Sequence, residues 1–134
     1  MKLRLARIIF LVFFSITATI YAQDFKAFAD EDIPEKPNPA RLVNDYTNTL
    51  NSSQVNTLEQ KLQAYMDSTS TQIVVVFVGT TGDYAIDDYA IRLGRKWGIG
   101  QAKKNNGLLL LIAKDDRKID IETGYGTEGF ISHI

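Results

Sequence analysis

The most regular feature of the chain is a pair of short, uninterrupted apolar runs. Residues 72–78 (QIVVVFV) and 108–113 (LLLLIA) consist almost entirely of β-branched, aromatic and aliphatic side chains, and both are too short to be helices. Strands that are apolar on both faces are typical of the interior of a parallel sheet. The pattern therefore predicts two central strands, joined by a right-handed parallel crossover that spans residues 73–113.

Apolar side chains recur at helical spacing in two further segments. The first covers about residues 51–67, and Asn51 with Gln54 at its start forms the pattern of a capping box. The second covers residues 86–97 and carries acidic side chains in its first turn and basic ones in its last, as the helix dipole favours. One helix therefore precedes the first apolar strand, and the other lies in the crossover.

Residues 118–123 (KIDIET) alternate between polar and apolar positions after a polar turn. A period of two predicts a strand, and the short turn makes it the antiparallel hairpin strand of the second apolar run. The elements together indicate an α/β fold, a Rossmann-like three-layer sandwich. Such a sheet needs a helical layer on each face, and two helices are few for that. Phe130 and Ile131 look like the start of another element, so we expect the domain to be incomplete at its C-terminal end.

The first 40 residues differ in composition from the rest of the chain. Residues 1–22 combine three basic side chains, an apolar stretch and small residues, which is typical of a signal peptide that is removed on export. Residues 23–40 are acidic and contain all three prolines, as expected of an extended leader. The α/β domain should then occupy residues 41–134. We expect an exported protein, located in the periplasm or cell envelope, with membrane association in a longer full-length form.

Composition excludes several classes of function. The chain has 134 residues and a net charge of −1, which becomes −4 without residues 1–22 (12 basic against 16 acidic side chains), so we expect no nucleic-acid partner. With no Cys and one His, thiol chemistry, disulfides and multi-His metal sites are excluded. Gly124, Gly126 and Gly129 match G-x-G-x-x-G, but they follow the return strand of a hairpin and only five residues come after them. We therefore expect no nucleotide cofactor.

Oxygen-bearing side chains are the remaining candidates, because carboxylates and carbonyl groups suit hard cations such as Ca²⁺ and Mg²⁺. The hairpin brings the end of its second strand beside the start of its first, so Glu122 and Glu128 should approach Asn105 and Asn106. Asp116 lies at the opposite rim, in the hairpin turn. A plainer interpretation stays open for each group: Asp116 is an ordinary turn former, and Glu122 only faces water.

An ordered series of short motifs is more specific than any one of them. The series comprises Val43-Asn44-Asp45-Tyr46, the strand at 72–78, Trp97-Gly98-Ile99-Gly100, Asn105-Asn106-Gly107, Asp115-Asp116-Arg117 and the stretch from Ile121 to Gly129. Over roughly residues 40–131 it resembles the TPM domain family, which includes YgcG-like bacterial proteins and thylakoid-lumen proteins of photosystem II repair. The resemblance implies a Rossmann-like sandwich, export or membrane attachment and, in some plant members, acid-phosphatase activity and calcium binding.

The resemblance also assigns candidate residues. The family's acidic positions match Asp45, Asp116, Glu122 and Glu128. We therefore expect an envelope module that assists the assembly or turnover of membrane protein complexes and binds a divalent cation, Ca²⁺ by resemblance. Its expected ligands are Asp45, Glu122 and Glu128, together with the carbonyl groups of Asn105 or Asn106.

Two alternatives remain open. The first is a metal-assisted acid phosphatase in which Asp116 and Glu122 act on a phosphomonoester of unknown identity. The second is a non-functional fragment of a longer protein, because Ser132-His133 stand where family members usually continue with Thr-Asp and a further helix.

Overall fold

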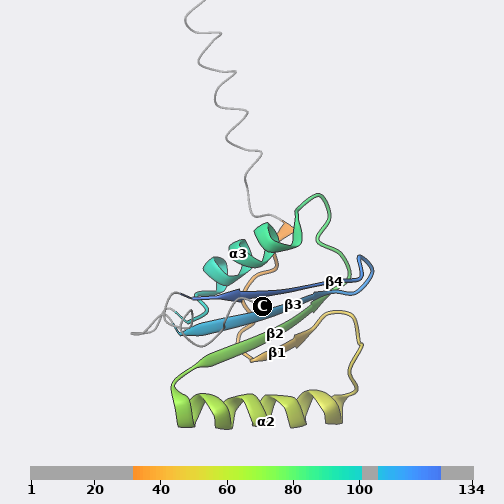
Figure 1. The fold of residues 1–134 in the computed structure, drawn as a ribbon. Helices are drawn as coiled ribbons and strands as arrows, with labels where there is room; N and C mark the ends of the chain where they lie inside the picture. Colours follow the sequence, from red (N-terminus) through yellow and green to blue (C-terminus); the bar gives the residue numbers. More distant parts are fainter. Residues whose placement is uncertain (1–31, 101–105, 125–134) are drawn as a thin grey trace, which may run out of the picture. The chain divides into compact units, whose positions relative to one another are not determined.

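The computed structural model describes residues 32–100 and 106–124. These described residues form six elements, all within the compact unit that begins at Ile33 (Figure 1). In chain order they are β1 (Val43–Asp45), α2 (Ser52–Thr69), β2 (Gln72–Val78), α3 (Ile86–Trp97), β3 (Gly107–Ala113) and β4 (Lys118–Thr123). The predicted helices and strands are present with bounds within two residues, and β1 is an additional strand.

The four strands form one sheet in the order β1-β2-β3-β4. β2 pairs in parallel with both β1 and β3, and β4 pairs antiparallel with β3. The mixed α/β fold, with its parallel crossover and antiparallel hairpin strand, is therefore confirmed. In the register of the sheet, Asp45 pairs with Phe77, Phe77 with Ile112 and Ile112 with Ile119. The carboxyl ends of β1, β2 and β3 therefore lie at the same edge of the sheet.

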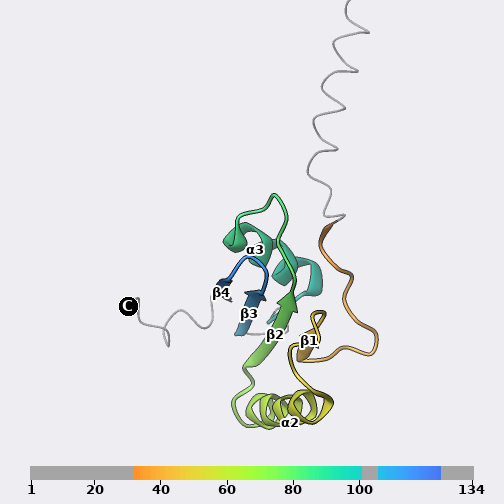
Figure 2. The same cartoon turned by 90° about the vertical axis from the view of Figure 1, so that its right-hand side faces the viewer.

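The two helices lie on opposite faces of this sheet, α2 on one and α3 on the other (Figures 1 and 2). The crossover from β2 through α3 to β3 is right-handed, as predicted, and this hand occurs in about 98% of such connections. The step from β1 to β2 goes the same way across the sheet but passes over the other face, so that crossover is left-handed. The chain therefore leaves β1 and β2 toward opposite sides, an arrangement that opens a crevice at the carboxyl edge of parallel strands.

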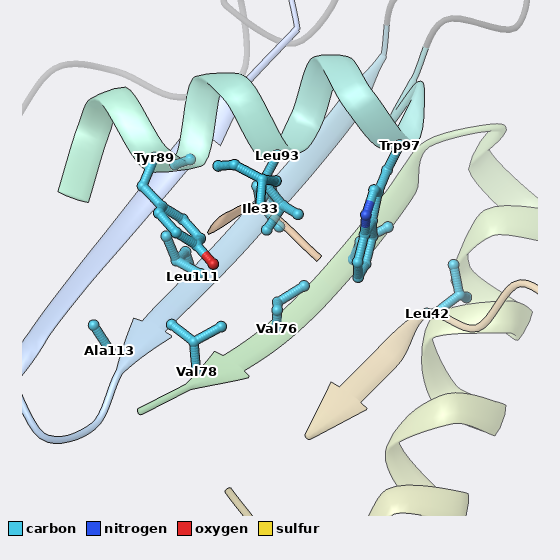
Figure 3. Close-up of a cluster of buried hydrophobic side chains, with 12 residues drawn as sticks. Ile33, Leu42, Val76, Val78, Tyr89, Leu93, Trp97, Leu111 and Ala113 are labelled. Carbon is cyan, nitrogen blue, oxygen red and sulfur yellow. The ribbon is translucent and has the colours of Figure 1, made fainter. Parts of the chain in front are cut away.

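The core lies between the sheet and α3 (Figure 3). Alternate residues of β2 and β3 point to this side and are buried: Val74, Val76, Val78, Leu109, Leu111 and Ala113. Tyr89, Leu93 and Trp97 of α3 pack onto them. The helical period of α3 thus meets the two-residue period of the strands, and burial of these side chains stabilises the fold.

The end of the expected leader belongs to this core. Ile33 is only 1% exposed and joins the buried cluster. The indole Nε1 of Trp97 donates to the carbonyl of Pro34 at 2.8 Å, and Nζ of Lys96 donates to the carbonyl of Ile33 at 2.7 Å. The compact unit that contains the sheet therefore includes Ile33, because this apolar residue of the acidic stretch has a buried place to occupy.

Helix α2 is held mainly at its ends and by one carboxylate. The predicted capping box is present, since Asn51 and Gln54 exchange side-chain to backbone hydrogen bonds of 2.9 Å. Glu59 accepts hydrogen bonds from the backbone N–H groups of Leu42 and Val43, at 2.8 and 2.7 Å. This carboxylate ties α2 to the start of β1. Neither α2 nor α3, the helices of the described ranges, is both long and apolar enough to cross a membrane.

Candidate functional site

Asp45 ends β1 at the carboxyl edge of the parallel strands and organises the loop that follows. Its Oδ1 accepts hydrogen bonds from the backbone N–H and the hydroxyl of Thr47, at 2.9 and 2.8 Å. Its Oδ2 accepts from the backbone N–H of Leu50 at 2.8 Å. Burial acts to raise the pKa of Asp45, but the hydrogen bonds from Leu50 and Thr47 together outweigh it and lower that pKa below its ordinary value. Asp45 is therefore ionised at neutral pH.

Asp116 lies at the same edge, in the turn between β3 and β4, and holds the loop that follows β2. It accepts hydrogen bonds from the hydroxyl of Thr80 and from the backbone N–H of Thr81, both at 2.9 Å. The Thr81 N–H and the Thr80 hydroxyl, with a smaller effect of the Lys118 charge, lower the pKa of Asp116. A second ionised carboxylate is thereby drawn over the end of β2, the strand next to β1.

The β3–β4 turn and the loop after β2 are joined at Gly79. The backbone N–H of Asp115 donates to the Gly79 carbonyl at 2.8 Å. A Cβ atom on Gly79 would lie 3.1 Å from Oδ2 of Asp115, closer than ordinary contact. A side chain at this position would therefore require the Asp115 carboxylate to shift by a few tenths of an ångström.

A groove of about 670 Å³ opens beside Asp45, lined by residues of β1, of the loop after it and of the first turns of α2. Its lining residues are mixed in character: Asp45 and Glu35 are acidic, Arg41 is basic, Asn48 is polar and Tyr46 is aromatic. Tyr46 is half exposed. A ligand entering this groove would meet both signs of charge near the loop that Asp45 orders.

Glu122 lies at the other end of the sheet, on β4, and its side chain points to the same face as α3. Burial, and then the negative charges of Asp120 and Asp87, raise the pKa of Glu122, while the positive charge of Arg95 partly opposes them. Of its expected neighbours, Asn106 donates from Nδ2 to the Ser70 carbonyl at 2.7 Å. The Gly124 N–H donates to the Gly107 carbonyl at 2.9 Å, which closes this end of the hairpin.

The structure does not bring Asp45 together with Glu122, contrary to the expected grouping. Asp45 and Glu122 are on the two outer strands and on opposite faces, because Asp45 pairs with Phe77 and Glu122 with Leu109. Three strand spacings of about 4.8 Å and three residue rises of about 3.3 Å separate them. Asp116 is likewise far along the hairpin from Glu122. Glu128 and Asn105 lie outside the described residues.

The described candidate residues therefore lie at two different ends of the sheet. Asp45 and Asp116 share the carboxyl edge, while Glu122 and Asn106 share the opposite end. Within residues 32–100 and 106–124 there is no group of three or more His, Asp or Glu side chains that could hold a metal ion. Sequence reasoning missed Thr80 and Thr81, although two hydroxyl residues directly after a central parallel strand are a usable signal for a functional edge.

Comparisons with known proteins agree with the fold. The TPM domain family model matches residues 43–133. The N-terminal domain of a P. gingivalis protein, solved by NMR, is 39% identical, with a TM-score of 0.61 over 66% of this chain and 57% of that one. The chain thus spans little more than half of that domain.

The N-terminal domain of a Corynebacterium glutamicum protein, also solved by NMR, has a TM-score of 0.56 over 69% of this chain and 60% of that one. It is 21% identical and supports the fold alone. No curated protein matches. Because the family model covers more than half of its residues, the chain belongs to the TPM domain family.

Proposed function

We propose that this TPM domain binds a divalent cation at the carboxyl edge of its parallel strands and acts as a module of the cell envelope. The observation that carries the proposal is the pair of carboxylates at that edge, Asp45 and Asp116. Both have a lowered pKa and are held in place by hydroxyl and backbone N–H donors. Ionised, oriented carboxylates are the ligands that hard cations prefer.

The number of protein ligands influences which cation fits. Mg²⁺ keeps several waters and is commonly bound by one or two carboxylates, whereas Ca²⁺ takes six to eight oxygen ligands. Two carboxylates suit the first mode, and waters with nearby carbonyl oxygens could complete the second. The resemblance supports Ca²⁺ and the number of carboxylates supports Mg²⁺, so both ions should be tested.

The direct experiment is a calorimetric titration with Ca²⁺ and with Mg²⁺ at neutral pH. Asp45→Asn and Asp116→Asn should each weaken binding at least tenfold, because each removes a charge while leaving one oxygen to hold its loop. Glu122→Gln, at the opposite end of the sheet, is the matched control and should bind like the parent. Circular dichroism verifies that each variant is folded.

The reverse result would contradict the proposal. If Glu122→Gln weakens binding and the two Asp variants do not, the cation is bound at the other end, by Glu122 with Glu128 and the Asn105 or Asn106 carbonyl groups. If neither Ca²⁺ nor Mg²⁺ gives a heat of binding to the parent protein, cation binding is rejected.

A phosphatase remains the second candidate, favoured by one observation. The turn that holds Asp116 also carries Lys114 and Arg117, and Lys118, the first residue of β4, is close enough to lower the pKa of Asp116. A phosphomonoester on a cation at this edge would meet positive charge as well. Release of phosphate from a chromogenic ester at acid pH, lost in Asp116→Asn, would favour the enzyme over the binding module.

The envelope location and the membrane complex as partner are proposed on the resemblance and on residues 1–22, which lie outside the described residues. They extend the cation proposal without depending on the same side chains. The cation titration therefore does not test the location or the partner. Cell fractionation tests the location.

A further inference from the structure

A second, smaller hollow lies at the amino end of the parallel strands, away from the carboxyl edge. Its lining includes Leu42, just before β1, Gln72 at the start of β2, Met66 near the end of α2, and Trp97 and Ile99 at the end of α3. We call this hollow the small pocket. Its volume is about 150 Å³, and a cavity of about that size holds a benzene-sized group. The small pocket can therefore accept one medium-sized side chain of a ligand.

The inner wall of the small pocket is apolar. Leu42, Val74 and Trp97 line it and are all buried, and Met66 of α2 is half-buried. The Trp97 ring extends from α3 toward the sheet (Figure 3), and its Nε1 donates to the Pro34 carbonyl at 2.8 Å. This hydrogen bond holds the ring in one position. Because burial of apolar surface is favourable, the small pocket selects an apolar side chain.

The charges around the small pocket are not balanced. Lys36 and Arg41 line it and are exposed, and neither side chain makes a hydrogen bond or an ion pair with a residue of the described ranges. Glu59 lines it as well, but its two oxygens accept from the backbone N–H groups of Leu42 and Val43. An unpaired arginine is suited to a carboxylate, which it binds through two parallel hydrogen bonds.

Arg41 also connects the small pocket with the groove beside β1. Pro37 and Arg41 line both hollows, so the two hollows share this part of the chain as a wall. Asn48 and Asn56 line the groove and are exposed. An amide side chain offers both a donor and an acceptor, and each peptide group of an extended chain needs the same two partners. The groove therefore suits a peptide backbone.

The acidic residues of the groove already have partners. Oε1 of Glu35 lies 2.7 Å from Nζ of Lys96. Asp45 accepts hydrogen bonds from Thr47 and Leu50 in the loop that it orders. A ligand that lies across the groove and the small pocket therefore meets unpaired positive charge where the two hollows adjoin.

We propose that the small pocket and the groove bind the C-terminal end of a peptide. The last side chain of the peptide is apolar and fills the small pocket, and its free carboxylate pairs with Arg41. The preceding residues extend along the groove past Asn48 and Asn56. Capture of a C-terminal carboxylate is a recurrent mode of peptide recognition. The proposal goes beyond the cation site, because Arg41 and the small pocket do not belong to the carboxyl edge.

The test uses the fluorescence of Trp97, which is the one tryptophan of the chain and lines the small pocket. The full chain is titrated with acetylated glycine-serine hexapeptides that end in leucine, valine or phenylalanine. At least one of them should change the emission and saturate below about 1 mM. The same peptide with an amidated C-terminus, or with serine as its last residue, should bind at least tenfold more weakly.

Two charge substitutions locate the carboxylate. Arg41→Gln should weaken binding of the free-carboxylate peptide at least tenfold and leave the weak binding of the amidated peptide unchanged. Lys61→Gln removes an equal charge from an exposed position of α2 outside both linings and should bind like the parent. Unchanged emission of each variant without peptide verifies that the surroundings of Trp97 are intact.

Three results would overturn the proposal: no saturable change with any of the peptides, equal binding of the amidated peptide, or an Arg41→Gln variant that binds like the parent. Acetylated leucine distinguishes the source of the carboxylate, because it carries the same side chain but cannot reach along the groove. It should bind at least tenfold more weakly than the hexapeptide. Equal affinity would overturn the peptide and identify a single apolar amino acid as the ligand.

Discussion

Asp120 illustrates how one carboxyl group can link stability to pH. Burial, and then the negative charge of Asp87, raise its pKa above the ordinary value. The folded protein therefore holds this proton more tightly than the unfolded chain does. The stability that results is fully present below the ordinary pKa of about 4 and is lost as the pH rises through the raised value.

Asp120→Asn should remove this penalty at neutral pH. We expect its free energy of unfolding at pH 7 to exceed that of the parent by about 1 kcal/mol, the lower end of the cost of an unpaired buried polar group. At pH 4 the difference should shrink. Urea unfolding at several pH values measures both, with Asp83→Asn, an exposed carboxylate, as the control. Parallel pH profiles for parent and Asp120→Asn would contradict this explanation.

Gly100 shows a different single-residue constraint, in which two backbones meet. It has a φ of 73°, and a Cβ atom there would overlap the backbone of Gly107. Gly82 also has a positive φ, of 60°, but the space around its missing Cβ is open within 4 Å. Comparing alanine substitutions at Gly82 and Gly100 therefore separates the cost of a positive φ from the cost of a clash between Cβ and the backbone.

Gly82→Ala should cost about 1 kcal/mol of unfolding free energy, the usual price of a left-handed alanine. Gly100→Ala should cost at least about 3 kcal/mol, because backbone atoms cannot yield as a flexible side chain does. Thermal or urea unfolding of the two variants checks the ranking. Equal losses would mean that the loop at Gly100 can move away from β3.

At the scale of elements, β1 is the strand that depends most on its neighbours. It has three residues, two of them polar, and its start is fixed by the Glu59 carboxylate of α2. No periodicity can reveal such a strand, because pairing with β2 and this carboxylate create it. The longer elements were predictable, since their apolar spacing is a local property.

Glu59→Ala should therefore loosen β1 selectively. Two backbone N–H groups would lose a charged acceptor, and hydrogen bonds to charged groups contribute about 1.5–3 kcal/mol each. Hydrogen exchange at Val43 and Asn44 should accelerate much more than exchange in β3. Gln60→Ala, an exposed change in the same turn of α2, is the control. Uniform acceleration across the sheet would point to global destabilisation instead.

At the scale of the whole molecule, the fold class followed from the sequence but the site only in part. Local patterns place Asp116 in a turn and Glu122 on a strand, and the hairpin puts them at opposite ends. They cannot place Asp45, because the position of β1 at the far side of the sheet and the face of each side chain arise from tertiary pairing. The expected meeting of Asp45 with Glu122 failed for that reason, and the pairing of Asp116 with Thr80 and Thr81 was not foreseen.

The hydrogen bond from Trp97 to Pro34 has a practical consequence for anyone who expresses this domain. A gene trimmed to begin at residue 41, where the composition changes, would remove the buried Ile33. It would also remove Pro34 and leave the indole N–H of Trp97 without its hydrogen-bond acceptor. The resulting protein would be a poor sample for spectroscopy or crystallisation. Recombinant versions should start upstream of residue 33.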